Sequence, residues 1–228
     1  MLAPNGVARV ALVTATAGYY HQSIPTARRV MHELCQRDGH LAVGTVIEDV
    51  HALPSLTPKL LAEHDVLCLL STSGELPLDP VQQSTILEFV AGGKAFVGIH
   101  AAAATLKDWV AYGEMLGGVF KMHPPALSFR VVVEDQSHPS TRHLPPTFGV
   151  LDELYTFTAN PRDASHILLR AESGAAGQDG DLPLAWTRTY GEGRVYYNAL
   201  GHFDADWERA EYQAQILGGL RWAARLEA

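Results

Sequence analysis

Cysteine is scarce in this sequence, with only Cys35 and Cys68 among its 228 residues. Cys35 falls inside a helical pattern and Cys68 inside the apolar run Val66–Leu70, so both are predicted to be small, buried hydrophobic residues. Two such cysteines exclude the disulfide framework of a small secreted domain, and we expect a reducing compartment.

Long basic runs and long apolar runs are also absent. The formal net charge is −8, from 17 Lys and Arg against 25 Asp and Glu, so the electrostatic footprint of a nucleic-acid or anionic-membrane partner is missing. No segment reaches the ~18 apolar residues of a membrane span, and residues 1–6 lack the basic and apolar parts of a signal peptide. We therefore expect a cytoplasmic protein with no nucleic-acid or membrane partner.

Short ligand-binding motifs are missing too. Neither the phosphate-binding loop G-x-x-x-x-G-K-[ST] nor the dinucleotide fingerprint G-x-G-x-x-G occurs, which argues against a phosphate site. No two histidines have the metal-ligand spacing H-E-x-x-H or H-x-H. A metal centre would therefore have to be assembled by the fold, from distant parts of the chain.

The chain has the composition of a globular protein, with 47% apolar and 18% charged residues, and we expect one domain over residues 1–228. Strands are predicted at residues 7–14, 42–47 and 66–70, and in the apolar run before His100. Helices are predicted after three polar residues that each precede a proline by one or two positions: Ser23, Thr57 and Asp79. In the helix after Asp79, one face would carry Val81, Ile86, Phe89 and Val90.

This alternation predicts a doubly wound, mostly parallel α/β sheet of the flavodoxin-like kind. The second half changes character, because predicted strands at 128–134, 166–170, 184–189 and 194–199 have few helices between them. We expect them to add partly antiparallel strands to the same sheet. A C-terminal helix over residues 208–224 should pack on the sheet through Tyr212, Ile216, Leu220 and Ala223. An apolar face left exposed on that helix would instead allow a homodimer.

His100 follows the apolar strand directly, where the chain turns near Gly98 and enters the small residues 101–103. A strand followed by such a turn points one side chain up from the carboxyl edge of the sheet, where open α/β folds bind ligands. The arrangement is that of a nucleophile elbow, with an imidazole where hydrolases place serine or cysteine.

Four histidines occupy predicted turns or glycine-rich loops at the ends of different elements: His21, His100, His123 and His202. Such residues can converge on one cleft. Since neutral imidazoles and one carboxylate are suitable zinc ligands, these four are also the candidate ligands of zinc or another divalent metal. The alternative is chance, because the chain has 11 histidines and some must fall in loops.

A carboxylate pair and a phenol lie together in Asp152-Glu153-Leu154-Tyr155. Neighbours on an extended segment point to opposite faces, so we expect Glu153, rather than Asp152, to share a site with Tyr155. Aromatic rings stack on the C–H faces of sugars, which makes Tyr20, Trp109 and Tyr155 candidate contacts to a carbohydrate, whereas Trp186 is expected in the core.

The chain resembles the ThuA-like (trehalose-utilisation) family, which has the class I glutamine amidotransferase-like fold. Five separated segments carry the resemblance: residues 20–24; 98–102; 117–124; 152–155 with 160–162; and 183–186 leading to 191–197 and 200–202. In that fold the elbow carries a cysteine that a later histidine activates. Here the elbow carries His100, and His202 falls at the place of the activating histidine, so glutaminase chemistry by that route is not expected.

The family's link to disaccharide utilisation implies a carbohydrate ligand, and we predict an enzyme acting on a disaccharide or keto-sugar derivative. His100 and His202 are predicted as the acid–base pair, with Glu153 as base or orienting group. The substrate contacts are predicted to be His21, His123, Tyr155, Trp109 and Tyr20. Two alternatives stay open: a carbohydrate-binding accessory protein without activity, and a metal-dependent hydrolase.

Overall fold

Strands and helices alternate through the first half of the chain in the computed structural model, which describes residues 6–226. The strands are β1 (Ala8–Val13), β2 (Leu41–Ile47), β3 (Val66–Leu70), β4 (Ala95–Ile99), β5 (Phe120–Met122), β6 (Leu127–Val133), β7 (Thr147–Asp152), β8 (Thr156–Phe157), β9 (His166–Ala171), β10 (Leu182–Tyr190) and β11 (Gly193–Asn198). The α-helices are α1 (Ile24–Asp38), α2 (Pro58–Ala62), α3 (Pro80–Ala91), α4 (Val110–Leu116), α5 (Asp204–Glu208) and α6 (Ala210–Ala223). Residues 1–5, which carried the prediction of no signal peptide, lie outside the described residues.

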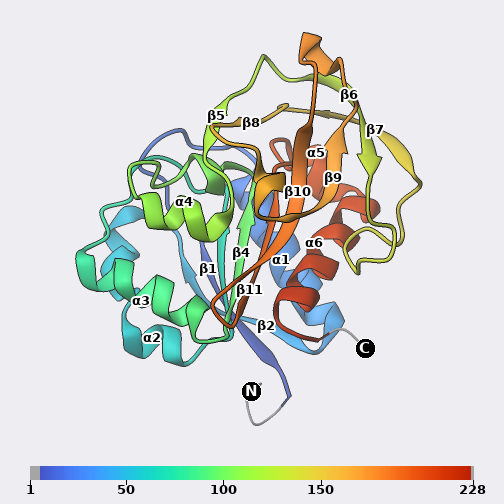
Figure 1. Ribbon diagram of the computed structural model, residues 1–228. Helices are drawn as coiled ribbons and strands as arrows, with labels where there is room; N and C mark the ends of the chain where they lie inside the picture. The colour runs from blue at the N-terminus through green and yellow to red at the C-terminus, as the bar shows by residue number, and fades with distance from the viewer. Residues whose placement is uncertain (1–5, 227–228) are drawn as a thin grey trace.

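Nine of these strands form one sheet in the order β2-β1-β3-β4-β11-β10-β9-β6-β7, and β5 pairs with β8 above it (Figure 1). The pairs from β2 to β11 are parallel, and those from β11 to β7 are antiparallel. The predicted α/β sheet with an antiparallel extension is therefore confirmed. Strand β7 was not predicted, because Gly149 and the exposed Leu151 break its alternation of polar and apolar residues.

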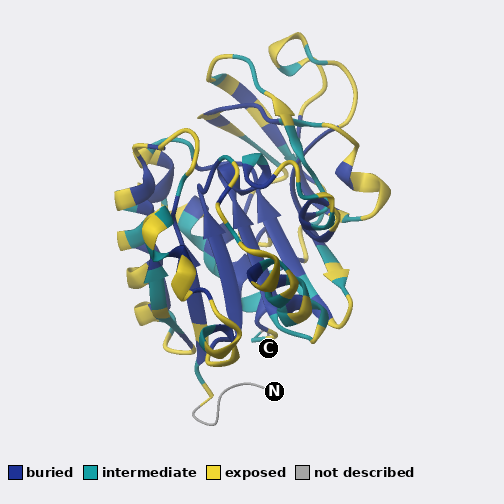
Figure 2. Ribbon diagram, turned by 90° about the vertical axis from the view of Figure 1, so that its left-hand side faces the viewer, coloured by how far each residue is buried: buried dark blue, intermediate teal, exposed yellow. Residues whose placement is uncertain are grey.

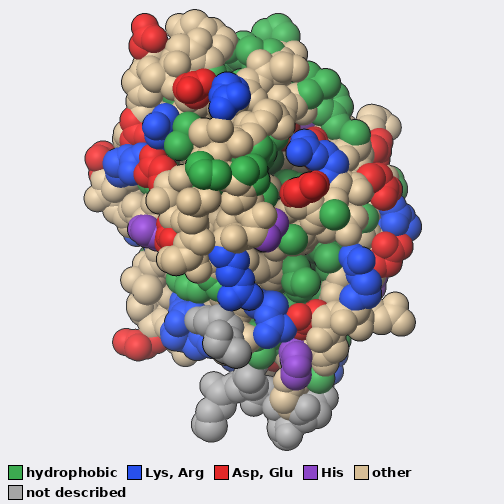
Figure 3. Space-filling view, turned by 90° about the vertical axis from the view of Figure 1, so that its right-hand side faces the viewer, with side chains coloured by type: hydrophobic (Ala, Val, Ile, Leu, Met, Phe, Trp, Pro, Cys, Tyr) green, Lys and Arg blue, Asp and Glu red, His purple; other side chains and the backbone are tan. Residues whose placement is uncertain are grey.

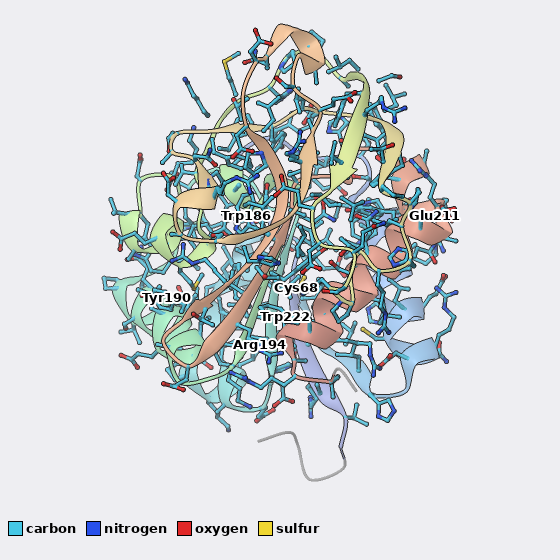
Figure 4. All side chains as sticks on the ribbon, turned by 45° about the vertical axis from the view of Figure 1, so that its right-hand side comes forward. Cys68, Trp186, Tyr190, Arg194, Glu211 and Trp222 are labelled. Carbon is cyan, nitrogen blue, oxygen red and sulfur yellow. The ribbon has the colours of Figure 1, made fainter. Side chains whose placement is uncertain are left out.

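Helices cover both faces of the parallel part of the sheet. In Figure 1, α2, α3 and α4 lie on one side of the central strands and α1 and α6 on the other. Strands β3 and β4 are buried along their whole length, as Figure 2 shows by their dark colour. Their continuous apolar sequences are typical of strands covered on both faces. Cys68 and Trp186 both lie inside this core, as predicted (Figure 4).

Two of the three predicted helix caps are confirmed. Thr57 accepts a hydrogen bond from the backbone of Leu60, and Asp79 forms a capping box with Gln82. Ser23 does not cap α1, because its backbone is helical and its hydroxyl donates instead to the carbonyl of Gly201 at 3.3 Å. That contact ties the start of α1 to the loop that carries His202.

One predicted helix face is wrong. Val81 is 60% exposed, whereas Ile86 and Val90 are buried against the sheet. Five residues of an α-helix span about 500°, so Val81 lies roughly 140° around the helix from Ile86 and cannot share its face. The sequence contains apolar residues on two sides of α3, and only one side meets the core.

The C-terminal helix packs on the sheet as predicted, with all four residues of its expected apolar face buried: Tyr212, Ile216, Leu220 and Ala223. The chain breaks at Arg209 into α5 and α6, where one helix was predicted. Where α6 crosses β11, the Arg194 guanidinium lies 4.9 Å from the ring centre of Trp222 and donates to its carbonyl (Figure 4). Since this face is covered, it offers no surface for a homodimer.

Charged side chains of both signs are interspersed on the face that Figure 3 shows. Within residues 6–226, none of the helices has the length and apolar character that crossing a membrane requires.

Candidate functional site

The candidate site lies at the carboxyl ends of the central strands. Leu70 of β3 and Ile99 of β4 are paired in register, and the next residue of each strand, Ser71 and His100, has a left-handed backbone with φ of 48° and 52°. Non-glycine residues rarely adopt this conformation, and it turns the chain sharply at both strand ends. The predicted elbow is therefore present, with His100 at its tip.

His100 is fully buried and held in one orientation. Its Nδ1–H donates to the Ala199 carbonyl at 2.7 Å, and its own carbonyl accepts a hydrogen bond from the Tyr197 hydroxyl. Because a carbonyl oxygen can only accept, Nδ1 carries the proton, and Nε2 of the neutral ring presents a lone pair. The site therefore has a fixed acceptor nitrogen at its floor.

Three further groups surround this nitrogen. His202 Nδ1 and the Tyr155 hydroxyl each lie 3.3 Å from His100 Nε2, and Glu153 Oε2 lies 3.5 Å from it. Glu153 Oε2 is also 3.3 Å from His202 Nδ1, while Oε1 is 3.4 Å from His123 Nε2. These separations exceed the ~2.7–2.9 Å of a charge-assisted hydrogen bond. Glu153 Oε2 is buried and has no hydrogen-bond partner among the described residues.

His21 closes the fourth side of the cluster. Its ring packs edge-on against His100, with ring centres 4.7 Å apart, and it forms a hydrogen bond with the Ser71 backbone. Its Nδ1 is buried without a hydrogen-bond partner in the part of the chain that the structure describes. One ligand-type atom from each of His21, His100, Glu153 and His202 lies within 4.8 Å of the other three.

Asp152 holds the two loops that deliver Glu153 and His202. Its buried carboxylate accepts hydrogen bonds from the backbone N–H groups of Glu153 at 2.7 Å, Gly201 at 2.8 Å and His202 at 3.4 Å. Burial and then the charge of Asp206 raise the pKa of Asp152 to about 7, against the effect of these N–H groups. Asp152 thus positions the site from below.

Above the cluster is a cavity of about 300 Å³. Its lining includes His21, Glu153 and His202 from the cluster, together with His123, Tyr155 and Phe120 from the β5–β8 pair and its flanking residues. His123 is held by donation from Nδ1–H to the Pro124 carbonyl, so its Nε2 is the nitrogen free to exchange a proton. The volume is at the lower end of the range of small-molecule sites.

Burial and neighbouring charges divide the protonation states of the cluster. Burial, followed by the charge of His202, lowers the pKa of His21 to about 4. Burial, followed by the charge of His21, lowers the pKa of His100. Burial alone would raise the pKa of Glu153, but the surrounding histidines, His202 first, outweigh it and lower that pKa. The interaction with Glu153 in turn raises the pKa of His202.

Six of the eight predicted site residues come together here: His21, His100, His123, Glu153, Tyr155 and His202. Trp109 and Tyr20 are not part of the cavity lining. Trp109 stacks on Tyr112 instead, and Tyr20 is half-exposed while its neighbour Tyr19 lines the cavity. Phe120 also lines the cavity and was not predicted, although it directly precedes the segment containing His123.

Neither cysteine takes part in the site. Cys35 is buried in α1 and Cys68 in β3, and both thiols are free. Burial raises the pKa of each thiol, to about 12 for Cys35, which leaves both unreactive as nucleophiles.

The family model ThuA, described as trehalose utilisation, matches residues 9–223. The chain belongs to the ThuA family. A comparison with curated proteins gives no match.

Solved structures share the fold of this ThuA protein. A ThuA-like protein from Bacteroides uniformis ATCC 8492 is 23% identical with a TM-score of 0.80, covering 94% of this chain and 90% of its own. A ThuA-like protein from Parabacteroides merdae ATCC 43184 is 20% identical with a TM-score of 0.81, covering 97% and 91%. A GMP synthase protein from Thermoplasma acidophilum is 12% identical with a TM-score of 0.59, covering 96% of each chain. At these identities the likeness concerns the fold alone.

Proposed function

We propose that this ThuA protein is an enzyme of carbohydrate catabolism that acts on a carbonyl-bearing derivative of a disaccharide or related sugar. The observation that carries the proposal is the convergence of imidazole, carboxylate and phenol groups from distant segments beneath one cavity. The family's description, trehalose utilisation, supports a sugar as the ligand. The reaction class is isomerisation or elimination by proton transfer.

A carbonyl group acidifies the C–H bond next to it, so a base at this carbon and a donor at the oxygen are the two groups the reaction needs. His123 Nε2 and the Glu153 carboxylate face the cavity and can remove the proton. The Tyr155 hydroxyl, whose pKa burial and then Glu153 raise well above its ordinary value, remains a hydrogen-bond donor at neutral pH. His100 is not among the residues that line the cavity, so its predicted role in acid–base catalysis acts through the neighbouring His202 and Tyr155.

Thermal unfolding of the wild-type protein with trehalose, other disaccharides, their keto derivatives and glutamine tests the ligand class. A ligand at ~100 times its dissociation constant adds about 2.7 kcal/mol, which corresponds to a Tm increase of roughly 5–10 °C for a chain of this size. We expect the increase with keto sugars and none with glutamine. Absence of any increase with every sugar would refute the proposed ligand class.

Exchange of the sugar C–H hydrogen for deuterium from the solvent, followed by NMR, tests the chemistry. We expect exchange with the wild type and a loss of about 100-fold or more in the His123→Gln variant, as removal of a general base produces. His143→Gln is the matched control, since His143 is an exposed histidine outside the cavity lining whose ring bonds to the Glu211 carbonyl. Sugar binding without exchange in the wild type would instead support the accessory, non-catalytic alternative.

A further inference from the structure

The atoms at the floor of the cavity have the spacing of metal ligands. The triangle formed by His100 Nε2, His202 Nδ1 and Glu153 Oε2 has sides of 3.3, 3.3 and 3.5 Å. Ligands about 2.0–2.1 Å from a zinc ion stand roughly 3.3–3.4 Å apart at the corners of a tetrahedron. These sides match that separation.

The remaining corner of the tetrahedron has a candidate as well. His21 Nδ1 is buried, has no hydrogen-bond partner within residues 6–226, and belongs to the group of four whose ligand atoms lie within 4.8 Å of one another. Glu153 Oε2 is the second buried atom of this cluster without a hydrogen-bond partner among the described residues. Buried polar atoms are almost always paired, so two unpaired ones facing the same point indicate a ligand between them.

The surroundings of the histidines also fit. A histidine that binds a metal through one ring nitrogen usually donates the other N–H to a backbone carbonyl or a carboxylate. His100 does so with Ala199 at 2.7 Å, and the His21 ring forms its hydrogen bond with the Ser71 backbone. Three neutral imidazoles and one carboxylate give a donor set of charge −1, which favours a divalent cation.

We propose that His21, His100, Glu153 and His202 hold a divalent transition-metal ion, with Zn²⁺ as the first candidate, at the floor of the cavity. Imidazole and carboxylate donors suit Zn²⁺ and exclude a preference for Mg²⁺ or Ca²⁺, which take mostly oxygen ligands. This inference deepens the proposed function and rests on it only for the role of the ion. Bound there, the ion polarises the sugar carbonyl oxygen, and His123 and Tyr155 remain for proton transfer.

A proton on His202 is the competing occupant of the same space. Protonated His202 would place its Nδ1–H between His100 Nε2 and Glu153 Oε2, which also brings these atoms near one another. A metal ion and a proton differ in what they require, because the metal needs all three histidines neutral and is removed by a chelator. Measurement of metal therefore separates the two.

The first experiment is the metal content of the wild-type protein, purified without chelators, by inductively coupled plasma mass spectrometry. The chelator-stripped protein is then titrated with Zn²⁺ alone in a calorimeter, and with Co²⁺ to record the visible absorption of a tetrahedral site. We expect one metal ion per chain. Zinc at ~100 times its dissociation constant should also raise the Tm of the stripped protein by roughly 5–10 °C.

The variants are Glu153→Gln and His202→Gln, with His51→Gln as the control because His51 is an exposed histidine far from the cluster in the chain. Loss of an outer-shell partner weakens metal binding by about 10–100-fold, so loss of a ligand should weaken it by at least about 100-fold. Far-UV circular dichroism and the Tm of each stripped variant show whether it folds. For a variant that does not fold, Co²⁺ absorption of the wild type at saturating metal decides alone.

Equal zinc affinity in the wild type and both folded cluster variants, or no metal binding by the wild type, would overturn the metal site. Sugar binding and deuterium exchange in a metal-free wild type would leave the proposed function standing without the metal. Zinc binding that depends on Glu153 and His202, with no sugar bound, would support the metal site and refute the proposed substrate. The two proposals therefore fail in distinguishable ways.

Discussion

Gly201 should be the least replaceable glycine near the site. Its φ of 113° lies outside the left-handed region that other residues tolerate, and a Cβ added there would lie 2.2 Å from the Tyr212 hydroxyl oxygen. In Gly201→Ala, the backbone strain costs about 1–3 kcal/mol. Tyr212 must also move, which breaks its buried hydrogen bond to the Leu200 carbonyl and costs about 1–3 kcal/mol more. We expect a loss near 4 kcal/mol, or roughly 8–16 °C in Tm.

Two other glycines separate the causes of this loss. Gly39 also has a positive φ, of 75°, but a Cβ there meets nothing within 4 Å, so Gly39→Ala should cost only about 1–2 kcal/mol. Gly149 has neither a positive φ nor a close neighbour, and Gly149→Ala should change stability by less than about 1 kcal/mol. Thermal unfolding of the three variants by circular dichroism gives the order. A Gly201→Ala variant as stable as Gly39→Ala would refute the argument from close packing.

Three further predictions concern buried or paired groups. Asp152→Asn should lose about 1–3 kcal/mol in urea unfolding, because a single amide oxygen replaces two oxygens that accept three N–H groups; an unchanged midpoint would contradict this. Cys35 and Cys68 should not react with a thiol reagent at pH 8 until the protein unfolds, and labelling faster than unfolding would show that the core opens locally. Hydrogen bonds from Arg162 lower the pKa of Asp181, so their contribution is present above the ordinary pKa and lost as pH falls through the native value. Asp181→Asn should therefore cost up to about 1 kcal/mol at pH 7 and less at pH 3, as compared by urea unfolding.

The elements predicted correctly from the sequence are those fixed by local signals. Thr57 and Asp79 each precede a proline and begin a helix, because the cap bonds lie within one turn. The apolar run of β4 predicts a buried strand, and a strand end predicts a side chain at the sheet edge. His100 and His202 were found in this way.

The features that were missed depend on contacts between distant segments. Asp152 accepts N–H groups from its own neighbour and from Gly201, and nothing near Asp152 in the sequence shows that the second loop is close. Similarly, the choice between Tyr19 and Tyr20 as the cavity residue depends on the direction of a loop that has no repeating pattern. Ser23 has the sequence of a cap but donates to Gly201, since a tertiary acceptor replaces the local one.

The place of β11 in the sheet has a consequence for the synthesis of the protein. Strand β11 pairs with β4 in the register Ala95 to Arg194, so the free edge of β4 waits for a strand near the end of the chain. On the ribosome, the four strands β1 to β4 emerge first and leave an apolar, unpaired edge exposed. His202 emerges later still, so the nascent chain holds His21 and His100 long before a ligand site exists. A chaperone that shields this edge would act on the half-made protein, and truncation within the last strand or the final helices should yield an aggregating chain.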